Sequence, residues 1–178
     1  LRGLACLDEE ISFGDGRFLL APSVHARLLA AAAPKSSDIA LDIGGGNGYP
    51  AAILSHLVST VIALESEEPR LLAAAKLWAD LSVCTVAGVR GAPEKGVQAH
   101  APYDLIVING AVARIPDEIM AQLAPGGRLV AVVRENPQAQ GRAVLVLREE
   151  GNIFSRRTLF DASVPYAPGF LPKPDFVF

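Results

Sequence analysis

The sequence predicts a single α/β domain built on a doubly wound, mostly parallel, seven-stranded sheet. Between residues 39 and 133, short apolar runs alternate with segments of helical composition, which is typical of a parallel sheet with helices on both faces. Two later strand-like segments, 143–148 and 154–159, are joined by a link too short for a parallel crossover, so we expect an antiparallel hairpin at the C-terminal end. All 178 residues fit one domain of ordinary size.

Helices are expected where a proline suits a first helical position and apolar, Ala/Leu-rich sequence follows. Ser66 is a candidate cap for the third of these helices, and the Pro-Gly-Gly run at 125–127 ends the fourth. The expected helices cover residues 22–33, 50–57, 66–80 and 116–123.

Strands are expected at the short apolar or β-branched runs between these helices. They cover residues 39–43, 60–64, 83–87, 105–108, 129–133, 143–148 and 154–159. Residues 1–21 are expected to form a loop region on the substrate side of the domain, with a turn at 14–16. Residues 164–178 hold four prolines among apolar residues, so we expect a tail without regular helix that packs along the domain.

Composition excludes several classes of protein. The net charge is −3 and the two signs are mixed along the chain, without the basic stripe of a nucleic-acid-binding protein. No apolar run reaches the roughly 18 residues that a membrane span needs. Cys6, Cys84 and the three histidines lack metal-ligand spacing, and Cys84 is expected in the core. We expect a reduced, cytoplasmic setting and, because the first residue is Leu1, further sequence before it. The oligomeric state does not follow from the sequence.

A glycine loop follows the first expected strand, in the sequence DIGGGNGY at residues 42–49. Glycine allows a sharp turn and the close approach of a ligand to the backbone. A dinucleotide fingerprint requires a small residue where this loop has the bulky Tyr49. Asp42 would repel a pyrophosphate but attract the ammonium group of a methionyl ligand, directly or through water. S-adenosylmethionine is therefore the expected cofactor, and a nicotinamide dinucleotide is the less favoured alternative.

A second carboxylate, Glu65, ends the next expected strand, about 20 residues beyond the loop. At this place a carboxylate can accept hydrogen bonds from both ribose hydroxyls, so it indicates an adenosine without choosing the cofactor class. Taken singly, Asp42 could cap a turn and Glu65 could be a solvated strand end. The expected cofactor-binding residues are Asp42, Gly44, Gly45, Gly46, Gly48, Tyr49, Glu65, Ser66 and Gly88.

Three segments resemble protein-L-isoaspartate O-methyltransferases, a family of class I S-adenosylmethionine-dependent methyltransferases. LDIGGGNGYPAAIL at 41–54, with 61–65, resembles the first motif of that family, and PYDLIVINGA at 102–111 resembles its fourth-strand motif. LAPGGRLV at 123–130 resembles its fifth-strand entry. With residues 16–22 upstream, the resemblance runs from about Gly14 to Phe160. It implies methyl transfer to the α-carboxylate of an isoaspartyl residue in a damaged protein, after which the ester collapses to a succinimide that can reopen as aspartate.

The chain departs from the family pattern, so it is interpreted as a divergent member. The family loop G-x-T-I-S-x-P reads GRFLLAP at 16–22, and Leu20 takes the place of the serine beside the reacting carboxylate. The family has Gly-Asp after the third strand, where this chain is expected to have Gly88 followed by Val89. The N-terminal helical segment common in the family is not found in these 178 residues.

The substrate-side candidates are Arg17, Leu20 and Asn109. Arg17 could replace the lost charge stabilisation by pairing with a carboxylate, or could be a solvated loop residue. Asn109 ends the fourth strand at the substrate edge of such sheets, or is a turn residue. No catalytic acid or base is assigned, because a carboxylate acceptor and a sulfonium donor need mainly alignment. The alternatives are methyl transfer to another carboxylate or small molecule, and a catalytically weak cofactor-binding module.

Overall fold

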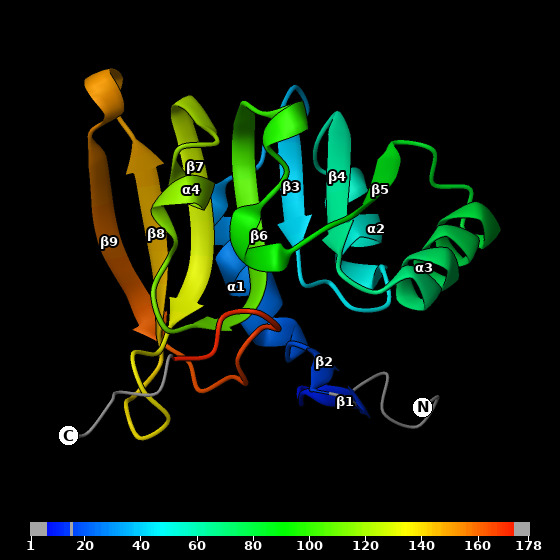
Figure 1. Cartoon of the computed structure of the whole chain (residues 1–178), viewed down its shortest axis with the longest axis horizontal. Helices are drawn as coiled ribbons and strands as arrows, with labels where there is room; N and C mark the ends of the chain where they lie inside the picture. Colours follow the sequence, from blue (N-terminus) through cyan, green and yellow to red (C-terminus); the bar gives the residue numbers. More distant parts are fainter. Residues whose placement is uncertain (1–6, 15, 173–178) are drawn as a thin grey trace.

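A seven-stranded sheet forms the centre of the computed structural model, which describes residues 7–14 and 16–172 (Figure 1). Its strands are β3 (Ile39–Ile43), β4 (Thr60–Glu65), β5 (Val86–Arg90), β6 (Tyr103–Val112), β7 (Leu123–Val133), β8 (Arg142–Arg148) and β9 (Phe154–Asp161). Their order across the sheet is β5-β4-β3-β6-β7-β8-β9. The first five are mutually parallel, while β8 is antiparallel to β7 and β9 to β8. The predicted doubly wound sheet with a C-terminal antiparallel hairpin is confirmed.

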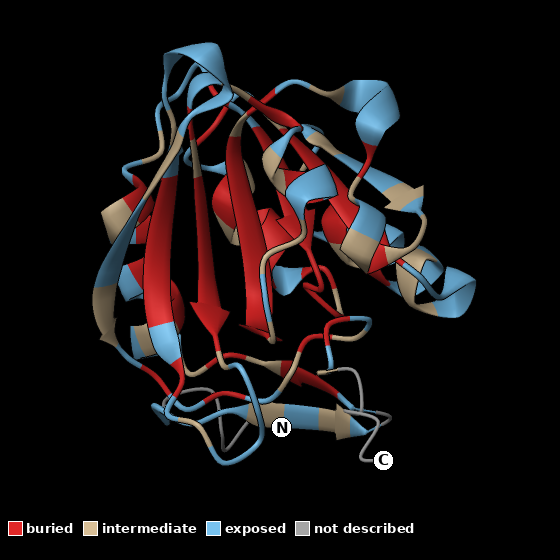
Figure 2. Cartoon of the chain, turned by 60° about the vertical axis from the view of Figure 1, so that its left-hand side comes forward, coloured by how far each residue is buried: buried red, intermediate tan, exposed pale blue. Residues whose placement is uncertain are grey.

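Helices cover both faces of this sheet, as the alternating sequence predicted. One face carries α1 (Pro22–Ala32), α2 (Tyr49–Ser55) and α3 (Glu68–Asp80), and the other carries α4 (Asp117–Met120) with the short 3-10 turns η2 (Pro93–Lys95) and η3 (Gln98–His100). Successive residues of each central strand point to opposite faces, and Figure 2 shows these strands buried between the two layers. A further 3-10 turn, η4 (Glu150–Asn152), links β8 to β9.

The expected N-terminal loop region contains a β-hairpin. β1 (Ile11–Gly14) pairs antiparallel with β2 (Arg17–Leu19), with Ile11 opposite Leu19 and Ser12 opposite Phe18. The apolar–polar–apolar order of Ile11, Ser12 and Phe13 before the predicted turn is the sequence signal for β1, and the burial of these residues alternates accordingly. With four and three residues, β1 and β2 are too short for such a pattern to predict them by itself. Residues 1–6 and Asp15 of the expected loop region lie outside the described residues.

Several element boundaries differ from expectation. β6 continues to Val112, four residues beyond its predicted end, so Asn109 lies inside the strand and neither ends it nor forms a turn. β5 begins at Val86, three residues later than predicted, so Cys84 lies exposed in the turn after α3 and the core assignment was wrong. α4 ends at Met120 because β7 already begins at Leu123, which pairs with Tyr103. The Pro-Gly-Gly run therefore interrupts the register of a strand, where it was expected to stop a helix.

The C-terminal segment packs against the end of β6, which confirms the expected tail packing for its described part. The Ala111 amide donates to Pro165 O and the Ala167 amide donates to Ala111 O, each across 2.8 Å. Gly110 makes this approach possible, because a Cβ there would lie 2.9 Å from Ala167. Residues 173–178 of the expected tail lie outside the described residues.

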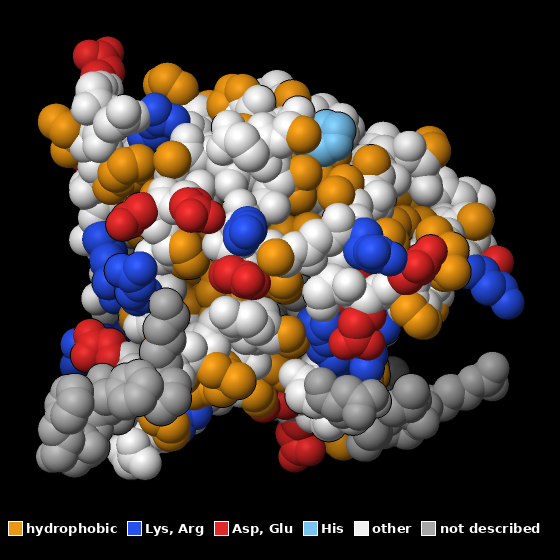
Figure 3. Space-filling model, viewed as in Figure 1, with side chains coloured by type: hydrophobic (Ala, Val, Ile, Leu, Met, Phe, Trp, Pro, Cys, Tyr) orange, Lys and Arg blue, Asp and Glu red, His pale blue; other side chains and the backbone are white. Residues whose placement is uncertain are grey.

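The surface carries both signs of charge. On the face seen in Figure 3, acidic and basic side chains are interspersed and form no continuous basic surface. None of the helices in the described part of the chain has the length and apolar character that crossing a membrane requires.

Candidate functional site

The glycine loop connects β3 to α2 at the carboxyl edge of the parallel strands. Gly44, Gly46 and Gly48 have φ values of +76°, +62° and +83°, in the left-handed region that favours glycine. A Cβ on Gly45 would lie 2.4 Å from Asp42 Oδ2, so the loop backbone lies directly on the Asp42 carboxylate. The predicted loop residues are therefore brought together, with Asp42 beneath them.

Asp42 is buried and held by a single side-chain amide. The Asn109 Nδ2 group donates to Asp42 Oδ1 across 2.6 Å and to Ile43 O across 3.2 Å. Burial raises the pKa of Asp42 to about 7, and the hydrogen bond from Asn109 opposes this rise. Asn109, expected on the substrate side, thus positions Asp42, while its own Oδ1 is buried without a hydrogen-bond partner.

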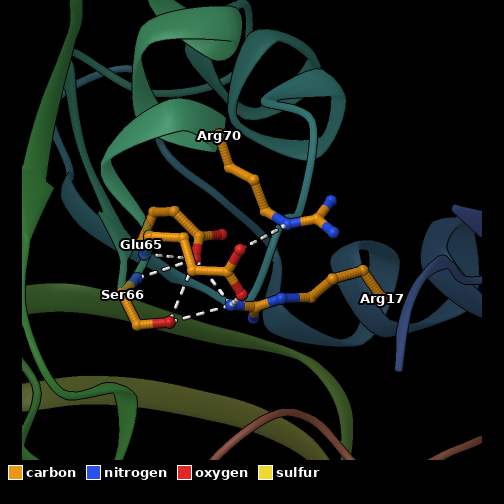
Figure 4. A network of polar contacts seen from close by, with 5 residues as sticks. Arg17, Glu65, Ser66 and Arg70 are labelled. Carbon is orange, nitrogen blue, oxygen red and sulfur yellow. Dashed lines mark hydrogen bonds and ion pairs between the residues drawn. The ribbon is translucent and has the colours of Figure 1, made fainter. Parts of the chain in front are cut away.

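Glu65 ends β4 beside this loop, and its two carboxylate oxygens have different environments (Figure 4). Oε1 accepts hydrogen bonds from the Ser66 amide at 2.7 Å, the Glu67 amide at 3.1 Å and Ser66 Oγ at 3.2 Å. Oε2 is buried and has no partner. The prediction that Ser66 caps the following helix is wrong, because the residue before α3 is Glu67 and Ser66 instead binds Glu65.

Arg17 of β2 reaches into the same cluster. Its Nη2 lies 2.7 Å from Glu65 Oε1, 2.8 Å from Ser66 Oγ and 3.1 Å from Glu67 Oε1. Arg17 is 3% exposed and Glu65 is 6% exposed, so the reading of Arg17 as a solvated loop residue is wrong. The carboxylates that Arg17 pairs with belong to this chain. Its Nε and Nη1 groups are buried without a partner.

Gly88 does not lie where the sequence suggested. It sits inside β5 opposite Ala63, and a Cβ there would lie 2.6 Å from the Leu71 side chain of α3. The residue that follows this strand beside Glu65 is Gly91, whose amide donates to Glu65 O across 3.0 Å. The expected strand ended three residues too early, which is why Gly91 was missed. Gly91 is followed by Ala92, so no acidic residue stands directly after the strand.

A cavity of about 420 Å³ adjoins the glycine loop. The β1–β2 hairpin, α1 and the start of α2 enclose it, and two substrate-side candidates, Leu20 and Asn109, line it together with Tyr49. His25 also lines this cavity, and burial lowers its pKa to about 4, so the imidazole is neutral at pH 7. The remaining wall is mainly apolar and includes Phe13, Phe18, Leu29 and Ile53.

These groups define the chemistry that the site can support. A glycine backbone without side chains, one buried carboxylate beneath it and one carboxylate oxygen without a donor suit a ligand with a cation and hydroxyl groups. Across residues 7–14 and 16–172, no three His, Cys, Asp or Glu side chains group closely enough to hold a metal ion.

Comparison with known proteins gives consistent matches. The sequence model of the family described as protein-L-isoaspartate(D-aspartate) O-methyltransferase matches residues 3–168. A protein-L-isoaspartate O-methyltransferase of Pelotomaculum thermopropionicum is 34% identical over 133 residues, which are 75% of this chain and 58% of that protein. One of Aeropyrum pernix is 32% identical over 174 residues, covering 92% of this chain and 64% of that protein. The chain thus spans about six-tenths of the length of these two relatives.

Solved structures share the fold. A structure named protein-L-isoaspartate O-methyltransferase superimposes with a TM-score of 0.82 at 24% identity, over 93% of this chain and 54% of the other. A Plasmodium falciparum structure of the same description, in complex with S-adenosyl-L-homocysteine, gives a TM-score of 0.73 at 17% identity, over 92% of this chain and 81% of the other. These matches agree with the sheet and helix arrangement described above.

Proposed function

This chain belongs to the protein-L-isoaspartate(D-aspartate) O-methyltransferase family, and from that premise we propose that it methylates the α-carboxylate of L-isoaspartyl residues in damaged proteins. The methyl donor is S-adenosylmethionine. The observation that carries the acceptor is the family match over residues 3–168. The adenosine part of the cofactor is supported by Glu65, whose buried Oε2 lacks a donor at the edge of the glycine loop. A ribose hydroxyl is a donor of the required kind.

The residues present fit the cofactor. Glu65 Oε2 would accept from the ribose, and the loop from Gly44 to Gly48 would lie along the methionyl side, with Gly91 beside Glu65. Asp42 supplies a negative charge beneath the loop, which favours a ligand carrying a cation. When bound, the cofactor supplies an electrophilic methyl group on a sulfonium.

The chain's own contribution is alignment. An acceptor carboxylate is already a nucleophile, so this chain has only to hold its oxygen in line with the methyl group. The bound cofactor would supply that methyl group, and its sulfur would keep the electron pair of the carbon–sulfur bond. No proton moves, so no catalytic acid or base is needed. The cavity lined by Leu20, Tyr49 and Asn109 adjoins the glycine loop and is the proposed acceptor site. Holding the two groups in line there provides the rate enhancement.

A second acceptor class is favoured by one observation. Leu20 and its apolar neighbours line the cavity where the family places a serine. A carboxylate or small molecule carrying an apolar group would fit this wall better than a polar peptide segment. The alternative of a catalytically weak cofactor-binding module also stays open until turnover is measured.

The test is methyl transfer from labelled S-adenosylmethionine to an isoaspartyl peptide, with the matched aspartyl peptide as the control acceptor. We expect transfer to the isoaspartyl peptide only. Equal labelling of both peptides, or of neither, would show that an isoaspartyl residue is not the specific acceptor. A panel of apolar carboxylic acids would then test the second class of acceptor. A thermal shift with S-adenosylhomocysteine but not with NAD distinguishes the cofactor class. The cytoplasmic setting and the lack of a nucleic-acid partner remain predictions.

A further inference from the structure

We infer that Arg17 is a positioning residue that couples the cofactor site to the adjoining cavity. It holds Glu65 so that Oε2 is left for the cofactor's ribose, and it fastens the β1–β2 hairpin over the glycine loop. This inference rests on the proposed function only in naming the ligand as an S-adenosyl compound.

The two carboxylate oxygens of Glu65 have different hydrogen-bond partners. Oε1 receives Arg17 Nη2 at 2.7 Å in addition to the Ser66 and Glu67 amides, so the protein itself satisfies this oxygen. Oε2, on the same buried carboxylate, receives nothing. The carboxylate is therefore fixed at one end and available at the other, as Figure 4 shows for its contacts with Arg17 and Ser66.

Arg17 comes from the β1–β2 hairpin. It lies in β2, and the residues that follow it, Phe18, Leu19 and Leu20, all line the 420 Å³ cavity. The same hairpin covers the loop, because a Cβ on Gly46 would lie 3.5 Å from the Phe13 ring and 3.8 Å from Phe18 O. One side chain thus connects the wall of the cavity to the carboxylate expected to bind ribose.

The pairing of Arg17 with Glu65 also balances charge. Arg17 and Glu65 are both more than nine-tenths buried, so Glu65 would be an uncompensated buried charge without Arg17. Arg17 itself would keep its second ion pair, with the exposed Glu67. A ligand that donates a hydroxyl to Oε2 leaves the Arg17 contact at Oε1 intact. We therefore expect ligand binding to stabilise the hairpin, which in turn shapes the cavity.

The experiment compares wild type with Arg17→Gln, Arg17→Lys and Glu65→Gln by calorimetry with S-adenosylhomocysteine and with its analogue lacking both ribose hydroxyls. Arg17→Gln is expected to weaken S-adenosylhomocysteine binding about ten- to a hundredfold, the effect of losing a hydrogen bond to a charged group. The same substitution should change binding of the analogue by less than about threefold, since that ligand cannot use Oε2. Arg17→Lys should recover part of the affinity.

Amide hydrogen exchange measures the coupling between the cofactor site and the β1–β2 hairpin in the absence of a methyl acceptor. In wild type, S-adenosylhomocysteine should slow exchange of the Phe18 and Leu19 amides, and in Arg17→Gln this protection should be lost even at saturating ligand. The matched control is Arg90→Gln, which removes an exposed arginine of β5 that pairs with Glu68 at the start of α3. It should leave both readouts unchanged.

The outcomes separate the inference from the proposed function. If Arg17→Gln fails to fold, Arg17→Gln/Glu65→Gln removes both charges and should bind S-adenosylhomocysteine no more weakly than Glu65→Gln alone. If the losses of affinity caused by Arg17→Gln and Glu65→Gln instead multiply in the double variant, the positioning role is wrong. Tighter binding by Arg17→Gln would overturn it as well, because Arg17 would then compete with the ribose. Wild type that binds no S-adenosylhomocysteine would instead contradict the proposed function.

Discussion

Asn109 donates its side-chain amide to Asp42 Oδ1 across 2.6 Å and so joins the carboxyl ends of β6 and β3. This hydrogen bond is the polar contact that stabilises the ionised form of a carboxylate otherwise surrounded by the glycine loop and α2. The pKa of Asp42 near 7 follows from burial outweighing that bond. Ionisation of Asp42 supplies the charge that the cofactor site requires, and it therefore lowers the stability of the ligand-free fold.

Replacing Asp42 by Asn should stabilise the ligand-free protein at pH 8 and leave it nearly unchanged at pH 4. The folded-state pKa of Asp42, about 7, lies above the ordinary aspartate value of 3.8. The free energy of unfolding therefore falls by up to roughly 4 kcal/mol as the pH rises from 3.8 to about 7, because ionisation of Asp42 favours the unfolded chain in this range. Thermal unfolding of both proteins across this range measures the difference. Asp80→Asn, at an exposed site on α3, is the control and should show no such dependence.

Cofactor affinity should rise with pH up to about 7 and then level off. A ligand cation favours ionised Asp42, so binding below pH 7 must release the proton that burial keeps on this carboxyl group. Calorimetry in buffers of different ionisation enthalpy measures the released proton. In Asn109→Ala, which removes the opposing hydrogen bond, the rise should move to higher pH. A flat profile in wild type would contradict a role for the Asp42 charge.

His25 should make the protein sensitive to acid. Burial lowers its pKa from 6.5 to about 4, so the unfolded chain binds a proton over a range in which the folded chain does not. The free energy of unfolding therefore falls as the pH drops from 6.5 to about 4, because protonation of His25 favours the unfolded chain in this range. His25→Gln should therefore lose less stability than wild type between pH 7 and pH 4 in chemical denaturation. His56→Gln, at an exposed histidine, should lose as much as wild type.

Arg128→Ala should destabilise the domain by about 3–5 kcal/mol, because it leaves Asp38 as an uncompensated buried charge. Arg128 Nη2 lies 2.6 Å from Asp38 Oδ2, and the guanidinium also donates to Ala32 O and Ala33 O at the end of α1. Arg90→Ala breaks an exposed ion pair and should change stability by less than about 1 kcal/mol. Equal midpoints of urea unfolding for the two variants would refute the structural role of Arg128.

Leu20→Ser should raise the rate with isoaspartyl peptides about ten- to a hundredfold, since a hydroxyl in this wall can donate to the acceptor carboxylate. Steady-state kinetics with saturating cofactor measure the change. Leu20→Ala enlarges the cavity equally without adding a donor and separates the hydrogen bond from the added space. If both variants accelerate alike, space rather than the serine hydroxyl limits the reaction.

The sequence by itself determined the sheet, the glycine loop and its two carboxylates. These are encoded locally: proline or glycine lies at an end of the apolar runs of α1 and β3, a β-branched run sets β4, and Glu65 directly ends that strand. The same local signals misplaced the boundaries of β5 and α4, where the strand pairings of Val86 and Leu123 decide the start of each strand. Cys84 and Gly88 were misassigned for that reason.

Only the tertiary structure decided how the polar groups are paired. Arg17 and Glu65 are separated by 48 positions and Asp42 and Asn109 by 67, and no local pattern specifies which charged or amide groups meet. These pairings form because β2 folds over the glycine loop and β6 lies beside β3, so that each buried charge finds a hydrogen-bond partner. From the sequence, Arg17 was either a solvated loop residue or a partner for a carboxylate, and the tertiary structure makes it a buried partner of Glu65, the carboxylate expected to bind ribose.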